Sequence, residues 1–136
     1  MPTTVERLVE RVPPHNLDTE MAVLGSMLMD DQAVPVALEM LQASSFYRDA
    51  HRKVFEAMTG LFNSQKPVDL VTLTEELKAT GKLEEVGGAD YLASLTSVVP
   101  TAANVQHYAK IVREKAMLRS LISAATQIVG RCYEDQ

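Results

Sequence analysis

The C-terminal stretch NVQHYAKIVREKAMLRSLISAATQIVGRCYEDQ, residues 104–136, contains no proline and predicts one long helix. A helix of roughly 30 residues extends about 45 Å, whereas a domain of roughly 100 residues has a radius of gyration near 13 Å. The helix must therefore project beyond the rest of the chain. This expectation limits the fold to a compact part with a helical extension.

The apolar pattern of this helix changes along its length. An N-terminal seam of Val105, Ala109, Val112 and Ala116 is typical of packing against a domain body. A wider stripe follows, made of Leu118, Leu121, Ile122, Ala125, Ile128, Val129 and Cys132. Burial of large apolar side chains is worth about 1.5–3 kcal/mol each, so a covering partner is expected. That partner is another copy, a second helix outside this chain, or both, unless the helix folds back on the body.

The preceding residues, 14–102, read as a head of several short helices, and residues 1–13 as a flexible tail. Asn16, Asp49 and Asp69 are predicted helix N-caps, with Asp18 and Glu20 near the positive end of the first helix dipole. The third helix is expected to direct its apolar residues inward, Phe62 included. The fold class is therefore all-α. In the stretch EEVGGADYL, Gly87 and Gly88 end one short helix, and the next begins at once and carries Tyr91.

Charge is unevenly distributed over the 136 residues, which carry a net charge of −5. Residues 1–102 have eight basic and 15 acidic side chains, and residues 103–136 have five and three. An acidic body argues against a DNA reader, which carries a clustered basic face. The basic part of the last helix, with Lys110, Arg113 and Arg119, is either a solvated face or a weak lining for nucleic acid.

The sequence offers no candidate for catalysis. It has neither a GxxxxGK[ST] phosphate-binding loop nor a GxGxxG fingerprint after a strand. The three histidines lack neighbours at metal-ligand spacing, and His51 reads as a surface or packing residue. One cysteine, no apolar run of membrane-span length and no signal peptide are consistent with the cytoplasm. We expect no catalytic, metal or cofactor site.

Five segments taken together resemble the N-terminal domain of bacterial replicative DNA helicases, the DnaB family. They are PPHNLDTEMAVLGSML, FYRDAHRKVFEAM, KPVDLVTLTEEL, LEEVGGADYL and VPTAANVQHYAKIVREKAMLRSLI, in that order, within residues 12–133. Each segment alone is weak, but five in order at suitable spacing are specific. Met21 and the pair Ser44-Ser45 depart from the usual family pattern.

The resemblance implies a helical head followed by the first arm of a helical hairpin. The second hairpin helix, a linker and an ATPase motor are expected outside this chain, and the motor would bind ATP and Mg²⁺. Pairs of heads and hairpins would build a trimer-of-dimers collar on a hexameric ring that encircles DNA. A helicase loader is a further candidate partner.

The same resemblance implies that the collar docks the C-terminal helicase-binding domain of primase. The residues that it suggests for this surface are Tyr91, Ile122, Ile128 and Asp18. Each also has a structural interpretation. Tyr91 would pack in the core, the two isoleucines would pack in the hairpin or dimer, and Asp18 would favour the helix dipole. A direct DNA-binding module that uses the basic part of the last helix is the alternative function.

Overall fold

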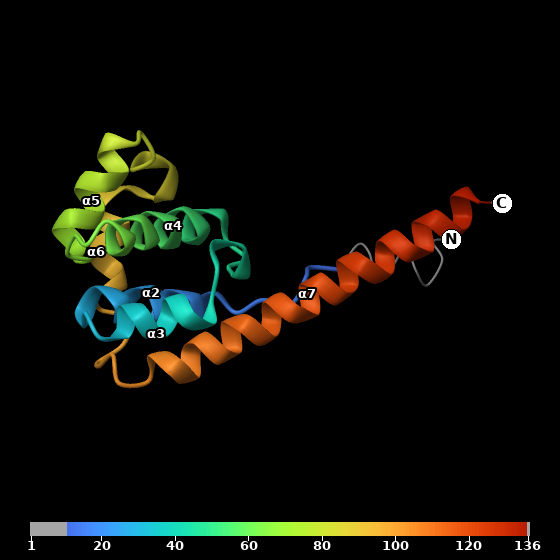
Figure 1. Ribbon diagram of the computed structural model, residues 1–136, viewed down its shortest axis with the longest axis horizontal. Helices are drawn as coiled ribbons and strands as arrows, with labels where there is room; N and C mark the ends of the chain where they lie inside the picture. The colour runs from blue at the N-terminus through green and yellow to red at the C-terminus, as the bar shows by residue number, and fades with distance from the viewer. Residues whose placement is uncertain (1–10, 136) are drawn as a thin grey trace.

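The protein is described by a computed structural model that covers residues 11–135 in detail. Figure 1 shows a group of short helices at one end and a single long helix that leaves it. The helices are α2 (Leu17–Met29), α3 (Ala33–Met40), α4 (Asp49–Asn63), α5 (Leu70–Ala79), α6 (Gly88–Leu95) and α7 (Val105–Glu134), with 3-10 helices η1 (Ala43–Ser45) and η2 (Glu84–Val86). Residues 11–135 form no β-strand, and the predicted all-α fold is confirmed. Residues 1–10 of the predicted tail lie outside the described part.

Local capping explains where two of the helices begin. The Asn16 side chain accepts a hydrogen bond from the backbone N–H of Thr19 at the start of α2. Asp69 and Thr72 form a reciprocal capping box at the start of α5. These contacts satisfy backbone N–H groups that have no partner within the helix. The predicted caps at Asn16 and Asp69 are therefore confirmed.

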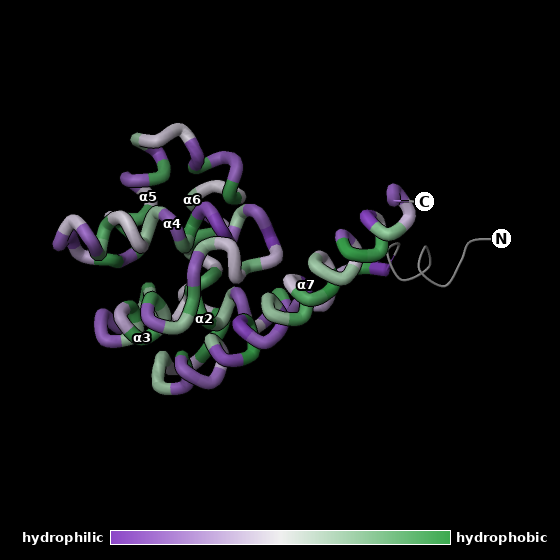
Figure 2. Tube along the Cα trace, turned by 45° about the vertical axis from the view of Figure 1, so that its right-hand side comes forward, coloured by the Kyte–Doolittle hydropathy of each residue, from purple (hydrophilic) through white to green (hydrophobic). Residues whose placement is uncertain are grey.

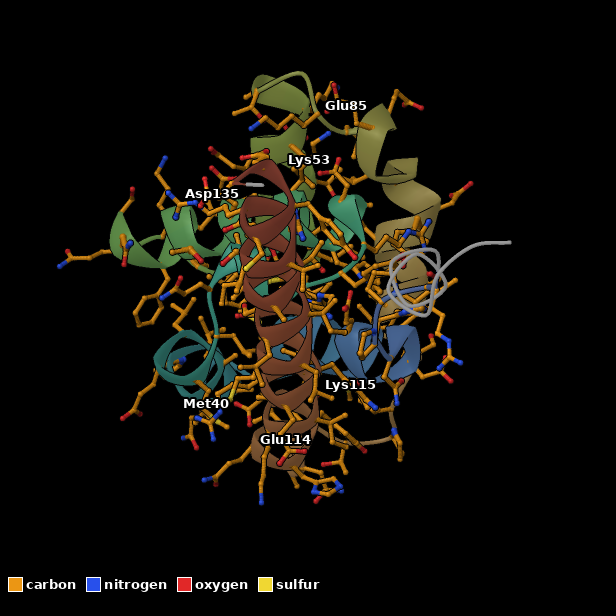
Figure 3. The ribbon with its side chains drawn as sticks, turned by 90° about the vertical axis from the view of Figure 1, so that its right-hand side faces the viewer. Met40, Lys53, Glu85, Glu114, Lys115 and Asp135 are labelled. Carbon is orange, nitrogen blue, oxygen red and sulfur yellow. The ribbon has the colours of Figure 1, made fainter. Side chains whose placement is uncertain are left out.

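The predicted cap at Asp49 is wrong. The N-cap of α4 is Arg48, and its side chain makes no capping hydrogen bond. Asp49 is the first residue of the helix, and its carboxylate lies 2.9 Å from Lys53 Nζ. Lys53 also pairs with Glu85 at 2.8 Å, a contact between α4 and η2 that Figure 3 shows near the top of the view.

The core lies between the helices of the head. Val23, Leu24 and Met27 of α2 are fully buried, and α2 contacts α3, α4, α6 and α7. Gly25 allows the close approach of α6, since a Cβ atom there would collide with the carbonyl oxygen of Leu95. Phe62 does not face inward as predicted. Its side chain is 41% exposed, because it lies near the end of α4 at the edge of the core.

The long helix α7 has two distinct halves. Val105, Ala109 and Val112 in its first turns are buried, and this part packs on α2 and α3. Beyond Val112 the helix stays in contact with the head as far as Arg119, and its later turns project away from the head (Figure 1). Thirty residues at 1.5 Å each give a length of about 45 Å, as expected from the sequence. The prediction of a head followed by a long helix is confirmed.

Candidate docking surface

The projecting half of α7 carries an exposed apolar stripe. Leu118 and Ile122 are each 45% exposed, and Leu121 and Ile128 are more than 60% exposed. Ala125 and Cys132 are also exposed, and Val129 is half-buried. Figure 2 shows hydrophobic residues recurring on the turns that extend beyond the head. Residues spaced three and four apart share one helix face, so this set can meet a single partner surface.

Tyr91 lies on α6, within the head, where the chain turns sharply. Gly87 has φ of +109° and ends η2, and α6 begins at the next residue. A Cβ atom on Gly87 would lie 2.9 Å from the Cβ atom of Tyr91. The first glycine therefore allows the turn and also leaves room for the tyrosine, since non-glycine residues seldom adopt this φ.

The Tyr91 hydroxyl is held by two side chains from the α4 region. It lies 2.7 Å from Nε2 of His51 and 3.3 Å from Nη1 of Arg48. The Arg48 guanidinium also lies over the tyrosine ring, 5.0 Å from its centroid. The ring is half-buried against the core. Tyr91 thus presents only part of its ring to a partner, while its hydroxyl is engaged within the chain.

His51 connects Tyr91 to a buried carboxylate. Its Nδ1 atom lies 2.8 Å from Oε1 of Glu20, and both residues are almost wholly buried. Glu20 also accepts hydrogen bonds from the backbone N–H groups of Tyr47, at 2.7 Å, and Arg48, at 3.4 Å. An ionised carboxylate has acceptor atoms only, so Nδ1 of His51 donates to it. In the neutral imidazole, Nε2 is then the acceptor for the Tyr91 hydroxyl, which accepts in turn from Arg48.

The surroundings of Tyr91 favour its neutral form. Burial raises the pKa of Tyr91 above its ordinary value of 10.0, and the charge of Glu20 acts in the same direction. The charge of Arg48 opposes both, because a cation stabilises the phenolate. The Tyr91 hydroxyl therefore keeps its proton to a higher pH than a free phenol does.

Arg119 lies at the point where α7 leaves the head. Its guanidinium donates to the carbonyl oxygens of Pro14, at 2.9 Å, and Ser45, at 2.8 Å. It lies 5.6 Å from the centroid of the Tyr47 ring, which stacks on His15. Burial lowers the pKa of Arg119 below its ordinary value, and the charge of Glu20 opposes that change. A guanidinium held by two carbonyl groups is not a free cation for a channel.

The other predicted site residues are accessible. Lys110 and Arg113 are exposed on α7, and Asp18 is exposed in the first turn of α2. Figure 1 shows α6 within the head and the last turns of α7 far beyond it, so Tyr91 and Ile128 do not meet within one chain. A surface that includes both must span the head and the projecting helix or take them from two chains.

Sequence reasoning missed the roles of Glu20 and His51. Glu20 was expected to act on the helix dipole, but it is directed toward α4 and is 1% exposed. The spacing of Glu20 and His51 from apolar residues on their own helices indicates that both side chains face the core. Glu20 precedes Val23, Leu24 and Met27 at spacings of three, four and seven, and His51 precedes Val54, Phe55 and Met58 at the same spacings. A charged and a titratable residue on two apolar faces indicate a buried pair.

No cluster of three His, Cys, Asp or Glu side chains suited to a metal ion occurs between residues 11 and 135. A shallow groove lies between η1 and α7, lined in part by Met40, Arg113, Met117 and Leu121. None of the described helices combines the length and hydropathy that a membrane span requires.

The fold and the exposed stripe define a class of protein, a helical domain whose accessible features are suited to contact with other chains. A family profile described as "DnaB-like helicase N terminal domain" matches residues 12–114. The chain belongs to this family, as the resemblance of its five segments predicted.

Individual relatives support the family assignment. The chain is 49% identical over 133 residues to the replicative DNA helicase DnaB of Geobacillus stearothermophilus, and covers 29% of that protein with 96% of its own length. It is 48% identical over 131 residues to the replicative DNA helicase DnaC of Bacillus subtilis. That alignment covers 95% of this chain and 29% of the relative. The chain thus spans less than a third of these relatives.

A solved structure supports the architecture. The crystal structure of the N-terminal domain of DnaB helicase from Mycobacterium tuberculosis aligns with a TM-score of 0.88 and 46% identity. The alignment covers 90% of this chain and 85% of that one. The helical head and the long helix are therefore shared with that domain.

Proposed function

We propose that this chain is the assembly and docking domain of a bacterial replicative DNA helicase and is not itself catalytic. The observation that carries the proposal is the exposed apolar stripe on the projecting half of α7. Several large aliphatic side chains on one face gain stability only when another helix covers them. Self-association through this stripe would pair the chains and build the N-terminal collar of a ring hexamer.

The second part of the proposal is docking of the C-terminal helicase-binding domain of primase. Tyr91 offers a half-buried ring on α6, and Ile122 and Ile128 offer exposed aliphatic side chains on α7. Aromatic anchors beside aliphatic groups are typical of strong interface contacts. Asp18 adds an exposed carboxylate on α2 for a basic group of the partner.

The activity of the whole protein follows from its relatives. Because those with known roles are replicative DNA helicases, the parent protein would be an ATP-dependent helicase of the bacterial cytoplasm. ATP, Mg²⁺ and the translocating DNA would bind the motor and the ring, and a helicase loader would be a further partner. Within this domain, Lys110 and Arg113 are exposed basic residues on α7 that would face the channel.

Analytical ultracentrifugation tests the proposal. We expect the chain to self-associate and to sediment faster when mixed with the primase C-terminal domain. A longer chain extended beyond Gln136 serves as the comparison, because a second hairpin helix would complete the surface. The proposal is contradicted if both the given chain and the extended chain remain monomeric and do not bind primase. Strong DNA binding with a steep salt dependence would favour the alternative of a DNA-binding module.

A further inference from the structure

The strongest unassigned feature is the continuous set of contacts that begins at Tyr91 and ends at Arg119. It passes from the Tyr91 hydroxyl through His51 to Glu20, and from Glu20 to the backbone of Tyr47. The Tyr47 ring then lies against the Arg119 guanidinium. The set joins α6, α4, α2 and the segment before α4 to the point where α7 leaves the head.

The centre of this set excludes water. The side chain of His51 is 0% exposed and that of Glu20 is 2% exposed. Polar groups buried to this degree have no replacement partner when one contact is lost, so the remaining groups must move or stay unsatisfied. The described part of the chain leaves no buried side-chain polar atom without a hydrogen bond. The arrangement therefore favours one geometry for all of its members.

The outer end of the set lies at the base of the projecting helix. Val112 is the last residue of α7 in the buried core, and Arg119 lies two turns further along. Its two hydrogen bonds to Pro14 and Ser45 hold α7 against the chain on either side of α2 and α3. After Arg119, Leu121 and Ile128 of the stripe are each more than 60% exposed. A small change at Arg119 therefore moves the distal stripe by a larger amount.

We propose that the buried Glu20–His51 pair positions the docking surface by holding Tyr91 on α6 and the base of the projecting half of α7 in a fixed relation. Glu20, His51 and Arg119 are positioning residues in this scheme, and the contacts to primase are made by others. The inference rests on the proposed docking function, and it adds how the two parts of that surface keep their geometry.

Distance measurements between α6 and α7 test the proposal without a partner. Spin labels go on Cys132, the single cysteine, and on Ala89→Cys, an exposed position in the first turn of α6. Labelled chain is diluted into excess unlabelled chain so that only distances within one chain are measured. We expect one narrow distribution in the parent protein, and broader ones after Arg119→Met or Tyr91→Phe.

Two matched variants serve as controls. Arg113→Met removes an exposed guanidinium from the same helix, and Tyr108→Phe removes the hydroxyl of another half-buried tyrosine. The side chains of Arg113 and Tyr108 make no hydrogen bond to other described residues, so both controls should retain the narrow distribution. Circular dichroism confirms that each variant is folded. Tyr91→Phe leaves the Glu20–His51 contact intact, so this variant should remain folded.

Binding of the primase C-terminal domain provides a second measurement. Arg119→Met and Tyr91→Phe should each weaken binding by about three- to tenfold, which is within the range for residues that modulate coupling. Because both act on one unit, the double variant should lose much less than the product of the two factors. Unchanged distance distributions, or fully multiplicative losses, overturn the proposal. If the parent chain fails to bind primase while Arg119→Met broadens the distances, the docking function fails and the positioning role stands.

Discussion

Nε2 of His51 lies 2.7 Å from the hydroxyl oxygen of Tyr91, although 40 residues separate them in the sequence. The other ring nitrogen of His51 contacts the buried Glu20. An exposed face of α6 is therefore tied to the centre of the head by a side chain that has no contact with solvent. Substitutions in this network should separate effects on stability from effects on docking.

Replacement of His51 by alanine should destabilise the head strongly. The change leaves the carboxylate of Glu20 buried without its imidazole partner, and the cost of breaking such a pair is about 3–5 kcal/mol. Tyr91→Phe removes one hydrogen bond at a half-buried site and should cost about 1 kcal/mol. Urea unfolding followed by circular dichroism measures both. His107→Ala, at an exposed position on α7, should change stability by less than about 0.5 kcal/mol. Equal effects for His51 and His107 would contradict the buried network.

Alkaline pH should reveal the raised pKa of Tyr91. Burial favours the neutral phenol, so its contribution to stability is complete below pH 10.0, the ordinary pKa, and is lost as pH rises through the folded-state pKa. Lys53, whose pKa is raised by its contacts to Glu85 and Asp49, adds a loss in the same direction above pH 10.5. The free energy of unfolding should thus decline less steeply between pH 9 and 11 in Tyr91→Phe than in the parent, with Tyr108→Phe as the control. Identical slopes in all three proteins would refute this assignment.

Gly87→Ala should destabilise the turn before α6. An added Cβ atom would lie 2.9 Å from the Cβ atom of Tyr91, and alanine would be held at φ of +109°. Such backbone strain costs about 1–3 kcal/mol. Gly60→Ala is the matched control, because nothing lies within 4 Å of its Cβ position in α4. That substitution should stabilise the protein by about 0.5–1 kcal/mol through helix propensity. Thermal unfolding of both variants measures the difference, and loss of stability at both positions would argue against the role of the turn.

Leu121→Asp should weaken self-association of the chain. The side chain of Leu121 is 64% exposed on the stripe, so a carboxylate there disrupts an interface without disturbing the head. Ser123→Asp adds the same charge on the opposite side of α7 and should leave association unchanged. Sedimentation equilibrium gives both association constants, and we expect at least a tenfold loss for Leu121→Asp, equivalent to about 1.4 kcal/mol. A similar loss for both variants would place the interface elsewhere.

Much of the fold was predictable because local patterns specify it. The side chains of Asn16 and Asp69 each bond to backbone N–H groups three residues away, so the sequence alone indicates where those helices begin. Asp49 looked equivalent, but it is the first residue of α4 and its carboxylate contacts Lys53. The backbone N–H of Tyr47, just before the helix, donates instead to Glu20, a residue 27 positions earlier. A contact between residues this far apart forms only when the helices pack together, and a local pattern does not show it.

The proposed docking surface also combines features that local sequence patterns predict with contacts that depend on how the helices pack. The sequence by itself determined a head and a long helix with an uncovered apolar stripe, because helical periodicity and the absence of proline are local properties. Only the tertiary structure decided that Arg119 is bound to two carbonyl groups and that the Tyr91 hydroxyl is engaged by His51. These contacts join residues 40 to 105 positions apart, and they depend on how the helices pack, which no local pattern encodes.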